Sequence, residues 1–239
     1  GFPQGRVTLT GSTEWEYNGG SPAARATSGT GEPWGRGEQA MSEVKHYALV
    51  HDQEPLRLFR SDFLEFFTHI HPLVVLLIWL PVSGYFAFLA VRDGSALSVI
   101  IGLLVGLFLW TLTEYLLHRF VFHFPPRSER QEKILFLFHG VHHAQPKCKT
   151  RLVMPPAVSI PLAALFYGLF WLVVDQALGL PAWLPPIFAG FIAGYLFYDM
   201  THYATHHFPM RRRLPKALKR HHMQHHYKTP NARFVVVLH

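Results

Sequence analysis

The sequence predicts an all-α integral membrane protein with four transmembrane helices in two hairpins and a cytosolic helical cap. Three observations lead to this prediction. Hydrophobic residues make up 49% of the chain and charged residues only 15%, whereas soluble domains carry nearer a quarter charged. Four apolar segments approach the roughly 20 residues that a helix needs to cross a bilayer. The chain also has 17 histidines, most of them in short clusters.

The chain divides into three parts by composition. Residues 1–40 are rich in Gly, Ser, Thr and Pro without hydrophobic periodicity, and we expect a disordered or non-native extension there. Met41 then opens a stretch that resembles an ordinary protein start, and residues 41–70 form a cytosolic or interfacial segment. Residues 71–239 are the membrane-embedded domain. A single cysteine, Cys148, excludes an internal disulfide.

The predicted spans cover about residues 71–91, 96–117, 152–174 and 182–201. They lack the polar face that a helix of a soluble bundle would carry, which argues against that alternative. The connectors within the first and last pairs are short, so each pair forms a hairpin that barely emerges on the far side.

Charge in the connectors orients the spans. The two short connectors contain one Arg and no Lys, whereas the segment between the second and third spans has seven basic residues and the tail has eight. The positive-inside rule therefore places both termini and the middle segment in the cytoplasm. The net charge of +7 then reflects topology and contact with anionic lipid rather than nucleic-acid binding.

Four histidine groups fall on that cytoplasmic side, and they are His118 with His123; His139, His142 and His143; His202 with His206; and His222, His225 and His226. Positions i, i+3 and i+4 share a helix face, so the histidines within each of the last three groups can converge. His118 and His123 lie about 140° apart on a regular helix, so they meet only if the helix ends or distorts. Residues 127–143 are expected to form an interfacial helix.

Ten histidines exceed what one metal ion can use, and two ions of coordination number five or six can use them all. Imidazole suits iron, zinc, copper and nickel. Asp199 and Glu114 precede ligand candidates by one helical turn and could accept the second ring N–H of a histidine. His207 and His221 are either such partners or spare neighbours. We interpret His46, His51, His69, His71 and His239 as ordinary surface or capping residues.

At these positions the sequence resembles the fatty acid hydroxylase / sterol desaturase superfamily, and most closely its fatty acid (sphingolipid) 2-hydroxylase branch. The matching motifs are EYLLHRFVFH (114–123), FHGVHH (138–143), YDMTHYATHH (198–207) and HMQHHYKTP (222–230), and SDFLEFFTHIHP (61–72) is also similar. The resemblance implies a dinuclear metal centre that is itself the catalytic group. Its implied ligands are His118, His123, His139, His142, His143, His202, His206, His222, His225 and His226.

The resemblance further implies two iron ions, with zinc replacing them in some purified proteins, and O2 as co-substrate. It implies hydroxylation of a lipid acyl chain, at C2, in a free or sphingolipid-linked fatty acid. Electrons would come from cytochrome b5, a ferredoxin or a reductase. The sequence has no His-Pro-Gly-Gly motif of a fused b5 domain, so the donor is expected to be a separate protein, and a bacterial inner membrane is favoured over the endoplasmic reticulum.

The end of the sequence departs from the family pattern. After Arg233 the family continues through a Gly-containing stretch, whereas this chain closes with FVVVLH, which we interpret as truncation or a frame change. A desaturase, sterol methyl oxidase or carotenoid hydroxylase would use the same histidines. A metal-transport or metal-storage protein is a further alternative, although transporters place ligands near the bilayer midplane and the interiors of the first three spans contain no histidine.

Overall fold

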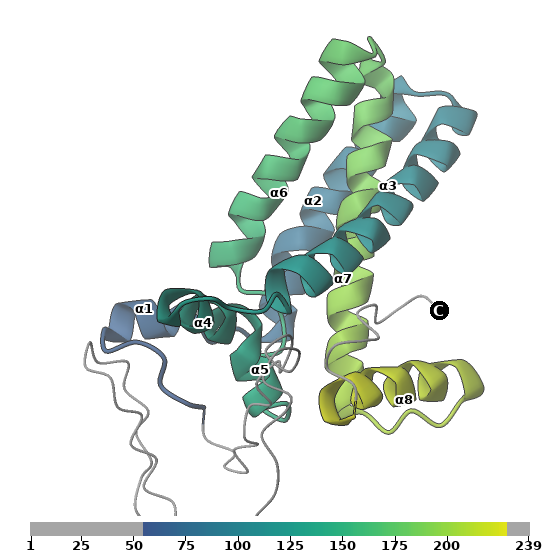
Figure 1. Cartoon of the computed structure of the whole chain (residues 1–239). Coiled ribbons are helices and arrows are strands. Elements are labelled where there is room, and N and C mark those ends of the chain that lie inside the picture. The colour runs from purple at the N-terminus through teal and green to yellow at the C-terminus, as the bar shows by residue number, and fades with distance from the viewer. Residues whose placement is uncertain (1–54, 229–239) are drawn as a thin grey trace, which may run out of the picture.

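The computed structural model describes residues 55–228, and every regular element in that range is a helix. The predictions for residues 1–40, for Met41 and for the shortened C-terminus lie outside the described residues. Four long helices run side by side (Figure 1), and they are α2 (Pro72–Asp93), α3 (Ala96–Leu116), α6 (Pro156–Phe170) and α7 (Leu184–His207).

Three helical segments in the described range are long and apolar enough to cross a membrane. They are Pro72–Asp93, Ala96–Phe122 and Pro156–Ala177. The second includes η1 (Leu117–Phe122), a π-helical continuation of α3, and the third includes η3 (Trp171–Ala177), a π-helical continuation of α6. The fourth predicted span corresponds to α7, which is long enough to cross a membrane but less apolar than these three segments. Most residues of α7 are buried against the other helices, so it carries polar groups such as Asp199 that a lipid-facing helix would not.

The two hairpins of the prediction are present. Gly94 ends α2, and the Ser95 side chain caps α3 by accepting a hydrogen bond from the Ser98 backbone N–H. The second connection runs from η3 through the short 3-10 helix η4 (Pro181–Trp183) into α7. Prolines in the first turns of α2, α6 and α7 occupy positions where a missing N–H costs no helical hydrogen bond.

Glycines bring α3 and α7 into backbone contact. A Cβ atom placed on Gly106 would overlap the carbonyl oxygen of Ile187, and one placed on Gly190 would overlap that of Leu103. Small residues at four-residue spacing allow such close helix packing in membranes. This contact fixes the axis of α7 relative to α3. The histidines of η1, which continues α3, and those at the end of α7 therefore lie at the same end of the bundle.

The remaining elements gather at that end (Figure 1). Three of them lie across it, and they are α1 (Asp62–Phe66), α4 (Glu129–Leu135) and α8 (Arg213–Tyr227). The other two are η2 (Phe136–Gly140) and α5 (Val141–Ala144), which follow α4 along the chain. The helix predicted over 127–143 is present as the continuous run α4–η2–α5. Its first turn is capped by the Ser128 hydroxyl, which accepts from the Gln131 backbone N–H.

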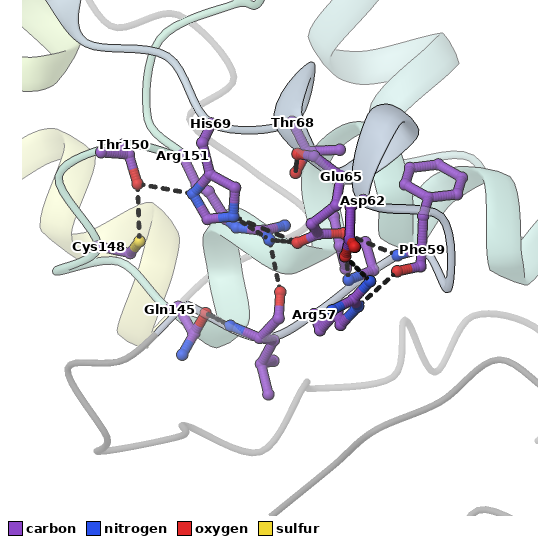
Figure 2. A network of polar contacts seen from close by, with 12 residues as sticks. Arg57, Phe59, Asp62, Glu65, Thr68, His69, Gln145, Cys148, Thr150 and Arg151 are labelled. Atoms are coloured by element: carbon purple, nitrogen blue, oxygen red, sulfur yellow. Dashed lines mark hydrogen bonds and ion pairs between the residues drawn. The ribbon is translucent and has the colours of Figure 1, made fainter.

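A polar network fastens the segment before α2 to the loop after α5 (Figure 2). Nη2 of Arg151 donates to Glu65 Oε1 and to the Leu56 carbonyl oxygen, at 2.5 Å each. Glu65 Oε2 in turn accepts from the backbone N–H groups of Leu58 and Phe59. Two further hydrogen bonds join the same segments, from Leu56 N to Gln145 Oε1 and from Ile70 N to the Thr150 carbonyl.

Candidate metal centre

The structure brings all ten histidines singled out by the sequence into two adjacent groups of five. The first group is His118, His123, His139, His143 and His225. The second is His142, His202, His206, His222 and His226. In each group the five potential ligand atoms lie within 4.8 Å of one another. Seven of the ten side chains are buried, and His123, His143 and His206 are half-buried.

Both groups follow the same pattern of helical pairs. The first takes an i, i+4 pair from η2 and α5 (His139, His143) and a single residue from α8 (His225). The second takes an i, i+4 pair from α8 (His222, His226) and a single residue from α5 (His142). The remaining pairs are His118 with His123 in the first group and His202 with His206 in the second. Consequently α8 and the η2–α5 run each supply both groups.

The pair His118 and His123 meets because α3 ends in a π-helix. A π-turn closes its hydrogen bond from i to i+5, and these residues are five apart across Leu117–Phe122. Their ring centroids are 4.9 Å apart. The distortion that their spacing required is therefore confirmed, and the helix ends at Phe122, shortly before Pro125 and Pro126.

The spacing of the ring nitrogens fits metal ligation better than hydrogen bonding. Nε2 of His142 lies 2.9 Å from Nε2 of His202 and 3.0 Å from Nε2 of His226. One ring nitrogen offers either one hydrogen or one lone pair, so it cannot satisfy both contacts as hydrogen bonds. Metal–imidazole bonds of about 2.0–2.1 Å at right angles place two nitrogens roughly 3 Å apart. The residues present therefore fit a bound ion in this group.

The first group shows the same spacing. Nε2 of His139 lies 3.1 Å from Nε2 of His118 and 2.9 Å from Nε2 of His143. Nitrogens on opposite sides of one ion would be about 4.2 Å apart for bonds of that length, close to the spread seen in each group. Five convergent imidazoles with no carboxylate among them suit a transition metal rather than calcium or magnesium.

Burial keeps the ligands in the form that binds metal. It lowers the pKa of His139, His142, His143 and His222 well below the usual 6.5, and neighbouring imidazoles add to the effect. For His123 the same causes lower the pKa to about 3. These rings are neutral at pH 7, and a neutral ring has the lone pair that ligation requires.

Aromatic rings from the spans hold two of the histidines in place. Phe122 stacks on His139 with centroids 5.2 Å apart, and Tyr198 stacks on His202 at 5.7 Å. The two acidic candidates are both buried. Asp199 accepts hydrogen bonds from the Met154 backbone N–H and the Tyr195 hydroxyl. Glu114 is buried and interacts electrostatically with Tyr198.

The other histidines divide as follows. His71 caps α2, because its Nδ1 accepts from the Leu73 backbone N–H. His69 joins the Arg151 network, where it contacts Glu65 and Thr150. His207 packs on Tyr203, and His221 is buried, but neither belongs to a group of five. His46, His51 and His239 lie outside the described residues.

Sequence reasoning missed the role of Arg151 and Glu65. These residues are 86 positions apart, and neither stands in a pattern that signals a contact. The sequence feature that pointed to this segment was the similarity of SDFLEFFTHIHP (61–72), which contains Glu65, to the family pattern. The network matters to the centre because Gln145 and Arg151 lie in the loop that follows the histidines of α5.

Known proteins resemble this chain in sequence. The profile of the fatty acid hydroxylase family matches residues 103–239. The dihydroceramide fatty acyl 2-hydroxylase FAH1 of Arabidopsis thaliana is 38% identical over 193 residues, which cover 80% of this chain and 79% of that protein. The ceramide very long chain fatty acid hydroxylase scs7 of Schizosaccharomyces pombe is 42% identical over 176 residues, covering 70% of this chain and 48% of that protein.

A solved structure has the same fold. Full-length scs7p, in which only the hydroxylase domain is visible, matches with a TM-score of 0.68 and 38% identity over 75% of this chain and 67% of that chain. Human fatty acid 2-hydroxylase is 34% identical over 72% of this chain and 51% of that protein. These named relatives come from eukaryotes, so they give no support to the expected bacterial inner membrane. On the family match and these identities, the chain belongs to the fatty acid hydroxylase family.

Proposed function

We propose that this protein is a membrane oxygenase that hydroxylates C2 of a fatty acyl chain, either free or linked to a sphingolipid. The observation that carries the proposal is the pair of five-imidazole groups at one end of apolar helices. A family profile and 2-hydroxylase relatives support the same activity. A desaturase, sterol oxidase or metal transporter is not favoured by these relatives.

We propose further that each group holds one iron ion through its five histidines. When bound, the two ions supply the activation of O2 and the removal of hydrogen from an unactivated C–H bond. The chain contributes neutral imidazoles in fixed positions, and the stacking of Phe122 on His139 and of Tyr198 on His202 restricts ring rotation. Burial of seven of the ten histidines excludes water from most of the centre.

The topology proposed for this activity has four spans. α7 runs beside the three apolar segments and its residues are largely buried among them, so its lower apolarity is compatible with crossing. The histidine end then faces the cytoplasm, because the basic residues of the middle segment and tail lie there. The exposed side chains of Arg211, Arg212 and Arg213 would attract lipid headgroups, and a separate protein would deliver electrons at this surface.

The test is expression of the full chain in a lipid-producing host, followed by mass spectrometry of the lipids. Wild-type protein should add hydroxylated acyl chains with a gain of one oxygen, whereas desaturation would remove two hydrogens. His142→Ala should abolish the products, and His71→Ala, a helix cap outside both groups, should retain them. Equal amounts of hydroxylated lipid with wild type and His142→Ala would refute the proposal.

A further inference from the structure

Helix α8 has two faces of different chemistry. Arg213, Lys216 and Arg220 are exposed, and at about 100° per residue their side chains point within roughly 60° of one another. These three residues are named the basic stripe. Lys216 and the buried His225 of the same helix point about 180° apart on the same count. The helix therefore directs its histidines towards the metal centre and the basic stripe away from it.

The charge of the basic stripe is not compensated within the described part of the chain. After Asp199 the sequence contains no Asp or Glu. No ion pair within residues 55–228 engages the stripe. Lys219, on the flank of the same helix, differs in that it donates to the Phe208 carbonyl oxygen at 3.0 Å. A row of exposed cations without acidic neighbours attracts a negatively charged partner.

An aromatic ring continues the basic stripe towards the end of α8. Tyr227 lies seven positions after Arg220, so its side chain points within about 20° of that of Arg220. It is 48% exposed, and its ring centroid lies 6.1 Å from that of His226. Protein interfaces are enriched in tyrosine and arginine. The outer face of α8 therefore combines positive charge with an exposed ring that adjoins a histidine of the centre.

The position of α8 favours a soluble partner over lipid headgroups. The helix lies across the end of α7 (Figure 1). Its inner face meets His118 of η1 and His202 of α7, and both of these helices continue from or run among the spans. The basic stripe on the opposite face is therefore turned away from the spans and from a bilayer that surrounds them.

The proposed reaction needs electrons from such a partner. When one atom of O2 enters a C–H bond, the other atom becomes water, and this balance takes up two electrons and two protons. A one-electron carrier supplies the electrons in two encounters and is itself oxidised each time, while water supplies the protons. An α-helix with its side chains is about 10–12 Å across. A carrier bound to the basic stripe is then separated from the histidines by the width of α8 alone.

We propose that the basic stripe docks an acidic one-electron carrier protein that reduces the metal centre. The inference rests on the proposed oxygenase function and names the partner's surface. Encounters between redox proteins bury less than about 1,200 Å² in total and are steered by complementary charge. The 15 residues of α8 extend over about 22 Å. A helix face of that length is large enough for a contact of this small class.

The first test measures binding of the acidic soluble domain of cytochrome b5 to the detergent-solubilised full chain by surface plasmon resonance. Lys216→Glu/Arg220→Glu reverses two charges of the basic stripe and keeps Arg213, which lies nearest to α7 and to the headgroups. It should weaken binding at least about tenfold, because like charges then face each other across the contact. Raising the salt concentration should weaken wild-type binding, since exposed charges are screened.

The matched control reverses the same number of charges elsewhere. Arg127 and Arg130 are exposed at the start of α4, which lies apart from α8 (Figure 1). Arg127→Glu/Arg130→Glu should keep wild-type affinity for the carrier. Equal weakening by the two double variants would overturn the inference, because the carrier would then respond to net charge rather than to the stripe. So would the absence of salt-dependent binding of wild type to both cytochrome b5 and an acidic ferredoxin.

The second test separates docking from catalysis. With reduced cytochrome b5 as donor, Lys216→Glu/Arg220→Glu should raise the donor concentration for half-maximal hydroxylation and leave the maximal rate close to wild type. With a small-molecule reductant its rate should equal that of wild type. Equal loss of rate with both donors would overturn docking, because the two residues would then serve the centre itself.

Two further outcomes are distinguishable. If Lys216→Glu/Arg220→Glu lost binding to phosphatidylserine vesicles but kept its affinity for the carrier, the stripe would be a headgroup site and the inference would be wrong. If wild-type protein formed no hydroxylated lipid with any donor, the proposed function would fail. The binding measurements would still decide whether the basic stripe docks an acidic carrier.

Discussion

Arg151 and Glu65 form an ion pair with Nη2 and Oε1 2.5 Å apart, and their side chains are only 2% and 14% exposed. Removing one member of a buried pair leaves an uncompensated charge and costs roughly 3–5 kcal/mol. We therefore expect Arg151→Leu to lower the thermal stability of the detergent-solubilised protein substantially. Asp62→Asn, which breaks the exposed pair of Asp62 with Arg57, should change stability by less than about 1 kcal/mol. A similar small change for both variants would contradict this view of the network.

Glu65 should also make stability depend on pH. Burial raises the pKa of this carboxyl, but hydrogen bonds from Phe59 and Leu58 and the charge of Arg151 outweigh it, so the pKa falls below the usual 4.5. A lowered pKa in the folded state gives stability that is present above pH 4.5 and lost as the pH falls through the folded value. Melting curves of wild type and Glu65→Gln should therefore converge below about pH 4.5. A constant difference down to lower pH would show that the charge is not the stabilising feature.

The π-helical end of α3 should be required for metal binding. Inserting one alanine after Val121 would move His123 one position further along the helix and turn it by roughly 100° away from His118. Metal content per polypeptide, measured by inductively coupled plasma mass spectrometry, should fall markedly. Val121→Ala keeps the chain length and should retain metal. Wild-type metal content in the insertion variant would show that His123 is dispensable.

Loss of a single ligand should weaken metal retention at the whole centre. Losing a residue that hydrogen-bonds to a metal ligand costs roughly 10–100-fold in metal affinity. His225→Ala removes a proposed ligand itself, so it should lower the metal affinity at least as much, as measured by competition with a chelator. His71→Ala provides the control, since its ring caps α2. Equal retention by the two variants would remove His225 from the ligand set.

The α3–α7 contact should tolerate no added methyl group. Gly106→Ala would place a Cβ against the Ile187 backbone, and such overpacking costs about 1–3 kcal/mol. At Gly84 in α2 an added Cβ meets nothing within 4 Å, so Gly84→Ala should be neutral or slightly stabilising because alanine favours helix. Melting temperatures measured side by side check this difference.

The sequence predicted which ten histidines the structure brings together, but not how they divide into two groups of five. Residues three and four apart share a helix face, so His139, His142 and His143 were expected to converge. In the structure the i, i+4 pair enters one group and His142 enters the other. On a helix, the side chains of His142 and His143 point about 100° apart. The group that each one joins depends on how α5 packs against α7 and α8, and the local sequence pattern does not give this packing.

The fold was predicted where the signal was local. Three apolar segments and both hairpins are confirmed, and the distortion at His118–His123 followed from spacing alone. The network of Arg151 was not predictable, because contacts across 86 positions leave no periodic trace. The glycine contact of α3 and α7 was equally hidden, since the sequence shows that small residues recur but not which helix they meet.

Because α8 and the η2–α5 run each reach into both groups of histidines, neither group can be assembled alone. An ion bound by His139 and His143 would also be bound by His225 of α8, and the same helix carries His222 and His226 of the neighbouring group. Binding of one ion would therefore position ligands of the second group. At limiting metal we expect a mixture of empty and fully loaded molecules, with half-loaded ones scarce, so that occupancy rises cooperatively during reconstitution.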